Sequence, residues 1–407
     1  MSASDPLPPV PPAGVVATTL VGPNPRGAVG RVSRAVRRVV LPLVDEGGTA
    51  VVLAVSGGAD SLALGVCALD VCSRAGAPVA SVTVDHGLRE GSDAEARGVA
   101  RLMGSLGAKA RCVHVDAGSD GRGSGPEGSA RDARWAALAD EAHRWARECG
   151  CHRVVVLLGH TMDDQAETVL LGLARGSGPG SLRGMAEIAA PVGTPGATEV
   201  TRVRPLLGVR RVDTRACCTA LGLEWVEDPT NRADGPWRAA DGSALRRAAV
   251  REDAMPALAR ALGVDPVPAL ARSAALMAAD DDALEAAARA ARTSVLLEGD
   301  EAARRVTRAR GGGADRAARH REGLHLDVRT LSDLEPALRD RVLHAALVEV
   351  SGRGGAVSGV HVGSVSELVT DWHGQGPLDV PGASVSRLPG AVLEMRARGG
   401  GAGAADQ

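Results

Sequence analysis

The stretch VVLAVSGGADSLALGVCALD, residues 51–70, stops an apolar run at Ser56 and resumes with helical spacing after Asp60. This pattern predicts a buried strand, a tight turn and a helix. Glycine frees the turn to adopt positive φ, so that successive N–H groups can point into one concavity, and the start of the helix adds its positive end. The turn therefore predicts a phosphate-binding loop formed by Ser56, Gly57, Gly58, Ala59, Asp60 and Ser61.

Asp60 would place a carboxylate beside those phosphates, where it is repelled unless a divalent cation lies between them. The loop thus predicts a nucleotide bound with Mg²⁺, with Asp60 as the metal ligand. It is not a Walker loop, because the G-x-x-x-x-G-K-[ST] pattern is absent and the single lysine, Lys109, lies elsewhere. A plain strand–turn–helix capped by Ser or Asp is the alternative interpretation.

A second group of polar residues lies within GHTMDDQAETVLLGLARGSGPGSLRGM, residues 159–185. On a helix starting near Thr161, Asp163 and Glu167 share a face, Asp164 is one position around, and His160 precedes them at a strand end. Acids in a cleft that holds phosphates would bind a metal or a cationic substrate group. Alternatively, the helix dipole favours acids in a first turn, and Thr161 with Asp164 has the pattern of a capping pair.

Arginines form the remaining candidate groups. In PEGSARDARWAAL, Glu127, Arg131 and Arg134 fall on one helical stripe, which is either an exposed ion-pair ladder or a group reaching the same cleft. Arginines also cluster at 246–251 and 304–321. Because the net charge of −2 gives no diffuse basic surface, local clusters of this kind are what an RNA partner would need.

The elements that must position these residues are a series of Val-rich runs. AVVLAVS, VASVTVDH, ARCVHVD and HRVVVLLGH alternate with Ala- and Leu-rich helical stretches. Continuous apolar strands that alternate with helices predict an α/β fold with a doubly wound parallel sheet, in which ligands bind beyond the carboxyl ends of the strands. Asp85 and His86, which follow the second run, are therefore further candidates for cofactor binding.

The chain of 407 residues is long enough for two or three domains. A disordered tail is expected at 1–28, a catalytic α/β domain at 29–232 and a helical RNA-binding or linker domain at 233–301. A linker at 302–322, a small C-terminal unit at 323–396 and a second disordered tail at 397–407 complete the expected order. Seven cysteines without a C-x-x-C pair, no signal-like N-terminus and no apolar run of 18 residues lead us to expect a cytoplasmic protein with no membrane contact.

The loop resembles that of the PP-loop ATP pyrophosphatases, which cleave ATP between the α- and β-phosphates. Six motifs narrow the resemblance to the tRNA(Ile)-lysidine synthetase family. They are SGGADS, VDHGLR (84–89), E-x-x-A-R-x-x-R-W (127–135), HTMDDQAET with RGSG, RPLL (204–207) and EDPTN (227–231), and they occur in the family's order. Trp135 stands where the family usually has Tyr.

The resemblance implies an ATP-dependent ligase that joins free L-lysine to C2 of the wobble cytidine in tRNA(Ile) with a CAU anticodon, through an adenylated intermediate. It implies that Asp163 and Glu167 hold the lysine ammonium groups and that Arg131 or Arg134 meets a carboxylate or phosphate. His160 and the acids are candidates for the proton acceptor. An ammonia-dependent PP-loop synthetase or a tRNA thiolase is the alternative, and both a monomer and a homodimer are left open.

Overall fold

The computed structural model describes residues 16–45, 47–87, 91–115, 125–176, 178–191, 198–227, 234–235, 245–310, 323–352 and 356–398, and for residues 125–130 it describes the backbone only. The chain divides into two compact units, Met1–Ala278 and Ala279–Gln407, which are described separately below. No helix among the described residues combines the length and apolar character needed to cross a bilayer.

The first unit is built on a five-stranded parallel sheet of order β3-β2-β1-β4-β5. The predicted doubly wound α/β fold is confirmed. The strand order reverses between β1 and β4, and in such sheets this is where ligands bind, outside the carboxyl ends of the strands. The strands are β1 Thr49–Ala54, β2 Val79–Asp85, β3 Lys109–His114, β4 Arg153–Leu158 and β5 Glu199–Val203.

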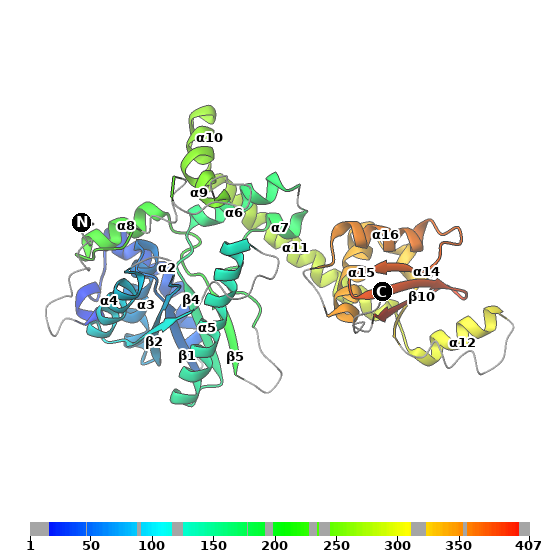
Figure 1. The fold of residues 1–407 in the computed structure, drawn as a ribbon, viewed down its shortest axis with the longest axis horizontal. Coiled ribbons are helices and arrows are strands. Elements are labelled where there is room, and N and C mark those ends of the chain that lie inside the picture. The colour runs from blue at the N-terminus through cyan, green and yellow to red at the C-terminus, as the bar shows by residue number, and fades with distance from the viewer. Residues whose placement is uncertain are drawn as a thin grey trace, which may run out of the picture. The chain divides into compact units, whose positions relative to one another are not determined.

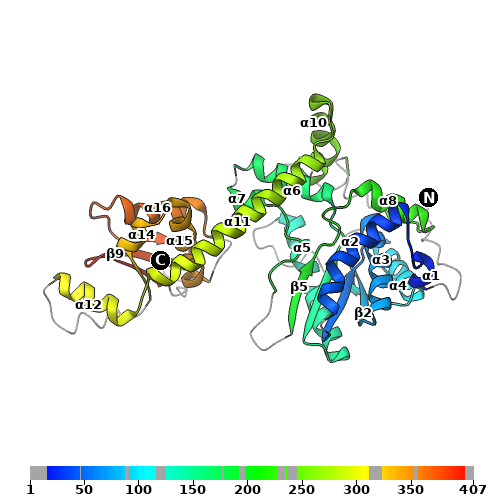
Figure 2. The ribbon, with the colours of Figure 1, turned by 180° about the vertical axis from the view of Figure 1, so that it is seen from behind.

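Helices cover both faces of this sheet because side chains alternate along each strand. In β1, Val51 and Leu53 join the core beneath α2 and α3, whereas Ala50 and Val52 pack on the face covered by α5. Figure 1 shows α5 in front of the sheet, and Figure 2, seen from behind, shows α2 over the opposite face. The helices are α2 Gly27–Val44, α3 Ala59–Ala75, α4 Ser92–Ser105, α5 Gly125–Cys149, α6 Met162–Ala174, α7 Pro179–Leu182 and α8 Arg211–Ala220.

Two features of this unit differ from the sequence-based expectation. Strand β5 was not among the four expected runs, because its sequence, EVTRV, contains Glu, Thr and Arg and lacks a continuous apolar run. The expected disorder of 1–28 does not extend to its last part, since Ala17–Val21 forms helix α1. Ala17 is buried and its N–H bonds to the Leu106 carbonyl at 3.0 Å, which ties this segment to the core. Residues 1–15 lie outside the described residues.

Helices follow the sheet, as expected. They include η2, a π-helical turn that continues directly from α9 into α10, and the boundary between the two compact units falls inside α11. The bounds are α9 Arg246–Ala249, η2 Val250–Ala254, α10 Met255–Leu262 and α11 Val267–Val295.

The second unit has an antiparallel sheet of order β6-β7-β10-β9-β8 with its own apolar core. Part of the expected linker 302–322 is helical, because α12 spans Gly299–Arg310 and buries Ala302, Ala303 and Val306; residues 311–322 lie outside the described residues. The remaining elements are β6 Leu296–Leu297, β7 Leu324–Asp327, α14 Val328–Asp333, α15 Pro336–Ser351, α16 Gly359–Thr370, β8 Leu378–Val380, β9 Ala383–Leu388 and β10 Val392–Ala397.

Candidate active site

A cleft of about 620 Å³ opens at the carboxyl ends of the parallel strands in the first unit. Its volume is in the range of ligand-binding pockets. The cleft is lined by most of the residues singled out from the sequence, and these come from three strand ends and from α3, α5 and α6. They are Ser56, Gly58, Ala59, Asp60, Ser61, Asp85, His86, Arg131, Arg134, His160 and Asp164.

The loop after β1 is held by hydrogen bonds between its two serines. Ser61 Oγ accepts from the Ser56 N–H at 3.1 Å and donates to the Gly58 carbonyl at 2.9 Å. Gly57 has φ +93°, and a Cβ there would lie 2.8 Å from Val99 Cγ2, so both conformation and space require glycine. Gly58 instead has φ −69° and is the N-cap of α3. The expectation of positive φ therefore holds at Gly57 alone.

The end of β4 closes against the start of α3. A Cβ at Gly159 would meet the Cα and N of Ser61 at 3.0 Å, so no other residue leaves this approach undisturbed. The first N–H groups of α3 have no intrahelical acceptor, which leaves them available to an anion. The close approach brings His160 and the start of α6 beside this anion-binding end of the helix.

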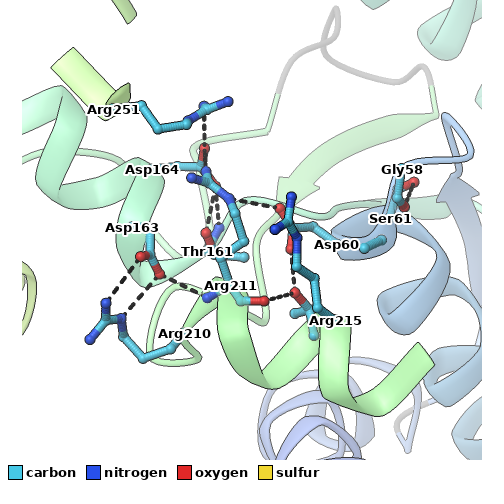
Figure 3. A network of polar contacts seen from close by, with 12 residues as sticks. Gly58, Asp60, Ser61, Thr161, Asp163, Asp164, Arg210, Arg211, Arg215 and Arg251 are labelled. Atoms are coloured by element: carbon cyan, nitrogen blue, oxygen red, sulfur yellow. Dashed lines mark hydrogen bonds and ion pairs between the residues drawn. The ribbon is translucent and has the colours of Figure 1, made fainter. Parts of the chain in front are cut away.

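Arg211, the first residue of α8, joins the acids of the loop to the acids of α6. Its guanidinium contacts Asp60 Oδ2 at 3.3 Å, Asp164 Oδ1 at 2.7 Å and Glu167 Oε1 at 3.2 Å. The Thr214 hydroxyl, one turn later in α8, donates to Asp60 Oδ1. We call Asp60, Asp164 and Glu167 the acid cluster, and Figure 3 shows Arg211 beside Asp60 and Asp164.

Asp60, Asp164 and Arg211 shift one another's ionisation. Burial disfavours the charged form of Asp164, but the Arg211 guanidinium and the hydrogen bonds from Thr161 outweigh it and lower the pKa of Asp164. Burial dominates at Asp60 and raises its pKa despite the contacts with Thr214 and Arg211. Burial also works against charge on Arg211, yet the surrounding carboxylates raise its pKa. The guanidinium is thus fixed as a cation among the carboxylates.

Asp163 and Glu167 are four residues apart on one helix, but their carboxylates bind different partners. Asp163 turns to the Arg210 guanidinium at 3.2 Å and accepts the Arg211 backbone N–H at 2.8 Å. Glu167 is buried and also receives Arg251, at 2.8 and 3.0 Å. The residue that joins Asp60 in lining the cleft is Asp164, not Asp163.

The capping interpretation of Asp164 is also confirmed. Its Oδ2 accepts from both the N–H and the hydroxyl of Thr161, at 2.8 and 2.7 Å, at the N-terminus of α6. The other oxygen, Oδ1, bonds to Arg211. One carboxylate therefore serves both roles that the sequence had presented as alternatives.

Four arginines, from α5, from β5 and from the position directly after β5, line another part of the cleft, and we call them the arginine wall: Arg131, Arg134, Arg202 and Arg204. Burial and the charges of Arg204, Arg131 and Arg134, set against the attraction of Asp164, lower the pKa of His160 to about 4. His160 is therefore a neutral imidazole near pH 7. It can accept a proton only weakly, although it can still accept a hydrogen bond.

Asp85 is buried at the end of β2, where internal partners occupy its oxygens. It accepts from the Gly87 N–H at 3.0 Å and the Ser92 hydroxyl at 2.7 Å, and it contacts His114 at 3.0 Å. Burial opposes ionisation, but these contacts lower its pKa. Asp85 thus shapes the turn that carries His86 along the cleft. The side chain of Glu127 lies outside the described residues.

Sequence reasoning missed several residues of the site, namely Thr214, Arg202, Arg204, Arg210 and Arg211, and it assigned Arg247 and Arg251 to RNA contact alone although both line the cleft. The available signal was RPLLGVRR, in which a strand end precedes two arginines that open a helix. Among the described residues, no three carboxylate, imidazole or thiol groups are arranged to enclose a metal ion.

Comparison with known proteins gives the same two-part division. The PP-loop domain matches residues 31–258 and the TilS substrate binding domain matches residues 326–392. The tRNA(Ile)-lysidine synthase of Salinispora arenicola is 42% identical over 355 residues, covering 87% of this chain and 92% of that protein. That of Salinispora tropica is 43% identical over 356 residues, covering 87% of this chain and 92% of that protein. That of Streptomyces coelicolor is 40% identical over 352 residues, covering 85% of each.

Proposed function

Because the chain belongs to the tRNA(Ile)-lysidine synthase family, we propose that it uses ATP to join the side-chain amine of free L-lysine to C2 of the wobble cytidine in the CAU anticodon of tRNA(Ile). The observation that carries the proposal is the convergence of Asp60 with Asp164 and Glu167 on one guanidinium, that of Arg211. In this proposal the phosphate-binding loop, which carries Asp60, lies beside the acids that attract the lysine amine, Asp164 and Glu167.

The reaction has two displacements. The C2 oxygen of cytosine attacks the α-phosphorus of ATP and pyrophosphate leaves, which turns an unreactive urea-like carbonyl into a carbon that bears an AMP leaving group. The lysine amine then attacks C2, AMP leaves and the amine gives up a proton. Both steps depend on positioning and on stabilising charge, which the helix start, the loop N–H groups and the cleft arginines supply.

Mg²⁺ is part of this proposal. The carboxylate of Asp60 is a hard oxygen ligand at the phosphate-binding loop, with Asp164 as a neighbouring acid close enough to raise its pKa further. The Arg211 guanidinium contacts both acids, which supports a preference for positive charge at this point. A bound Mg²⁺ would neutralise the phosphate oxygens and would be held by Asp60.

For the amine we propose Asp164 and Glu167 as the acids that attract the lysine ammonium before it loses its proton. This revises the pair inferred from the family resemblance, because Asp163 is engaged by Arg210 and the Arg211 backbone. In this proposal Asp163 positions Arg211, whose guanidinium holds the acid cluster in place. His160 and the acids stay candidates for the proton acceptor, and Arg131 or Arg134 for the contact with a phosphate.

The test is mass analysis of anticodon nucleosides after incubation of the protein with tRNA(Ile), ATP and lysine. A cytidine whose mass has risen by the lysine residue, with one AMP formed for each, is the expected result. A tRNA for methionine with the same anticodon should stay unmodified. ATP consumption without any change in nucleoside mass would contradict the proposal. We further propose that the protein acts in the cytoplasm, where its substrates are made.

A further inference from the structure

The arginine wall contains Arg202, near the carboxyl end of β5, and Arg204, the residue directly after that strand. The Arg202 guanidinium lies 4.6 Å from the centre of the Trp135 ring. Trp135 comes from α5 and packs on the apolar core beneath that helix. The stack fixes the plane of the guanidinium while leaving its edge, which carries the N–H donors, open to a partner.

The hydrogen-bonding capacity of these two side chains is largely unused. Arg204 donates to the Ala186 carbonyl at 2.8 Å, but its Nε and the Nε of Arg202 are buried without an acceptor among the described residues. Neither side chain pairs with a carboxylate in the part of the chain that the structure describes. Buried donors without acceptors are costly, and their presence in a cleft indicates a ligand that supplies the acceptors.

The other arginines at the cleft provide the contrast. Arg211 and Arg251 lie within hydrogen-bonding distance of acid-cluster carboxylates, so their charge is already compensated. Arg202 and Arg204 instead lie close to each other. Burial, which is the largest cause, and the positive charges of Arg202 and Arg131 lower the pKa of Arg204 to about 10. A group with two or more anionic oxygens would relieve this repulsion and fill the empty acceptor positions.

ATP and RNA both carry such oxygens, and position favours RNA. The loop after β1 already offers a place for the ATP phosphates, whereas Arg202 and Arg204 lie beyond β4, at the edge strand of the sheet. Under the proposed function a cytosine must enter the cleft, and it cannot do so without its flanking phosphodiesters. Unpaired RNA is recognised through its backbone and through stacking on aromatic and guanidinium planes.

We infer that Arg202 and Arg204, with Arg202 oriented by Trp135, form a subsite for a backbone phosphate next to the nucleotide that enters the cleft. The inference rests on the proposed function for the identity of the RNA. It assigns no chemical step to these residues: they fix the strand so that the base reaches the phosphate-binding loop in one register.

The test compares Arg202→Ala with Arg101→Ala, which removes the same charge from an exposed position on α4. Affinity for tRNA(Ile) is measured at several salt concentrations, and affinity for ATP is measured separately. We expect Arg202→Ala to bind tRNA about tenfold more weakly, with a salt slope shallower by about 0.7 to 0.9 for the lost phosphate contact. ATP affinity should be unchanged, and Arg101→Ala should match the unsubstituted protein in both measurements.

Trp135→Leu keeps apolar area and removes the stack, so it should reproduce part of the loss of tRNA affinity. If Arg202→Ala does not fold, Arg202→Lys replaces it, and we expect about threefold weaker binding at an unchanged salt slope, because charge remains while the planar fork is lost. Equal tRNA binding by the Arg202 and Arg101 variants would overturn the inference, as would a fall in ATP affinity with tRNA affinity intact. Absence of lysidine with the unsubstituted protein would count against the proposed function alone, since the binding comparison can be made without catalysis.

Discussion

The acid cluster, of which Asp60 and Asp164 line the cleft, and the arginine wall handle charge in opposite ways. In the acid cluster every carboxylate has an arginine nitrogen within 3.3 Å. In the arginine wall Arg202 and Arg204 have no carboxylate partner among the described residues, and burial and mutual repulsion lower the pKa of Arg204 to about 10. The pKa of Arg211, a guanidinium of the same chemistry, is raised.

The difference indicates in which parts of the cleft the charges are already compensated by the protein itself, without substrate. A compensated group of charges can contribute to folding, whereas a group of like charges works against folding and is useful once an anion arrives. Substitutions in the acid cluster should therefore affect stability and chemistry together, and those in the arginine wall should affect RNA binding with little effect on stability.

The largest effect is expected for the acid nearest the phosphates. Asp60→Asn removes the proposed Mg²⁺ ligand while retaining an oxygen for the Thr214 hydroxyl, so AMP and pyrophosphate formation should be abolished with the fold intact. Both products are quantified by chromatography, and urea unfolding serves as the check on folding. Substantial AMP production by this variant would remove Asp60 from the chemistry.

Arg211→Ala should cause the largest loss of stability. It leaves three carboxylates without their shared partner, and removing one member of a buried ion pair costs about 3 to 5 kcal/mol in the free energy of unfolding. Arg215→Ala, one turn later in α8, removes an exposed pair with Glu227 and should cost about 1 kcal/mol or less. Urea unfolding measures both, and equal losses would mean that the acid cluster does not depend on Arg211.

Glu167→Gln should raise the KM for lysine by about 10- to 100-fold, since a hydrogen bond to a charged group is worth roughly 1.5 to 3 kcal/mol. Asp163→Asn is the matched control on the same helix. Because Asp163 contacts Arg210 and the Arg211 backbone, its substitution should change the lysine KM less. Steady-state kinetics with lysine as the varied substrate measure both values, and a larger effect at Asp163 would restore the assignment based on family resemblance.

Arg204→Met tests the same comparison in the arginine wall. It replaces a half-buried cation among like charges with an apolar side chain, so we expect the free energy of unfolding to change by less than about 1 kcal/mol. The same urea titrations apply. A loss as large as that of Arg211→Ala would show that the arginine wall, too, is compensated within the folded protein.

A further effect concerns the pH dependence of stability. The pKa of His160 falls from 6.5 to about 4 on folding, because burial and the charges of Arg204, Arg131 and Arg134 outweigh Asp164. The unfolded chain thus binds this proton more readily, so the stabilisation from a neutral His160 is fully present above pH 6.5 and is lost as pH falls toward 4. His160→Gln should flatten the decline in stability across this window, measured by urea unfolding at several pH values. An unchanged slope would mean that His160 titrates normally.

Much of the α/β fold could be predicted because each central strand and the first turn are specified by a short stretch of sequence. Buried parallel strands are continuous apolar runs, and Gly57 marks a turn whose φ of +93° only glycine adopts readily. The edge strand β5 lacked that run. Most of the cleft residues could be found by the same logic, since the carboxyl ends of parallel strands meet at one edge of the sheet.

The pairing of charges could not be predicted in this way. Arg211 meets Asp60 across 151 residues and Glu167 across 44, and no local pattern encodes such contacts. Helical periodicity put Asp163 and Glu167 together, but the direction of each carboxylate depends on α8, which packs from elsewhere in the chain. Likewise, nothing in the sequence around Trp135 indicated that the Arg202 guanidinium lies over its ring.

The π-helical turn η2, Val250–Ala254, places Arg251 and bears on how this chain is compared with others. A π turn holds one more residue than the α-helical turn it replaces, and each residue advances an α-helix by about 100°. Deleting one residue here would convert η2 into an α-helical turn and leave Arg246 and Arg247 facing nearly the same way relative to α10. A one-residue insertion or deletion in this turn would thus be absorbed locally, and two sequences that differ by this one residue are correctly superimposed only when the gap is placed inside η2.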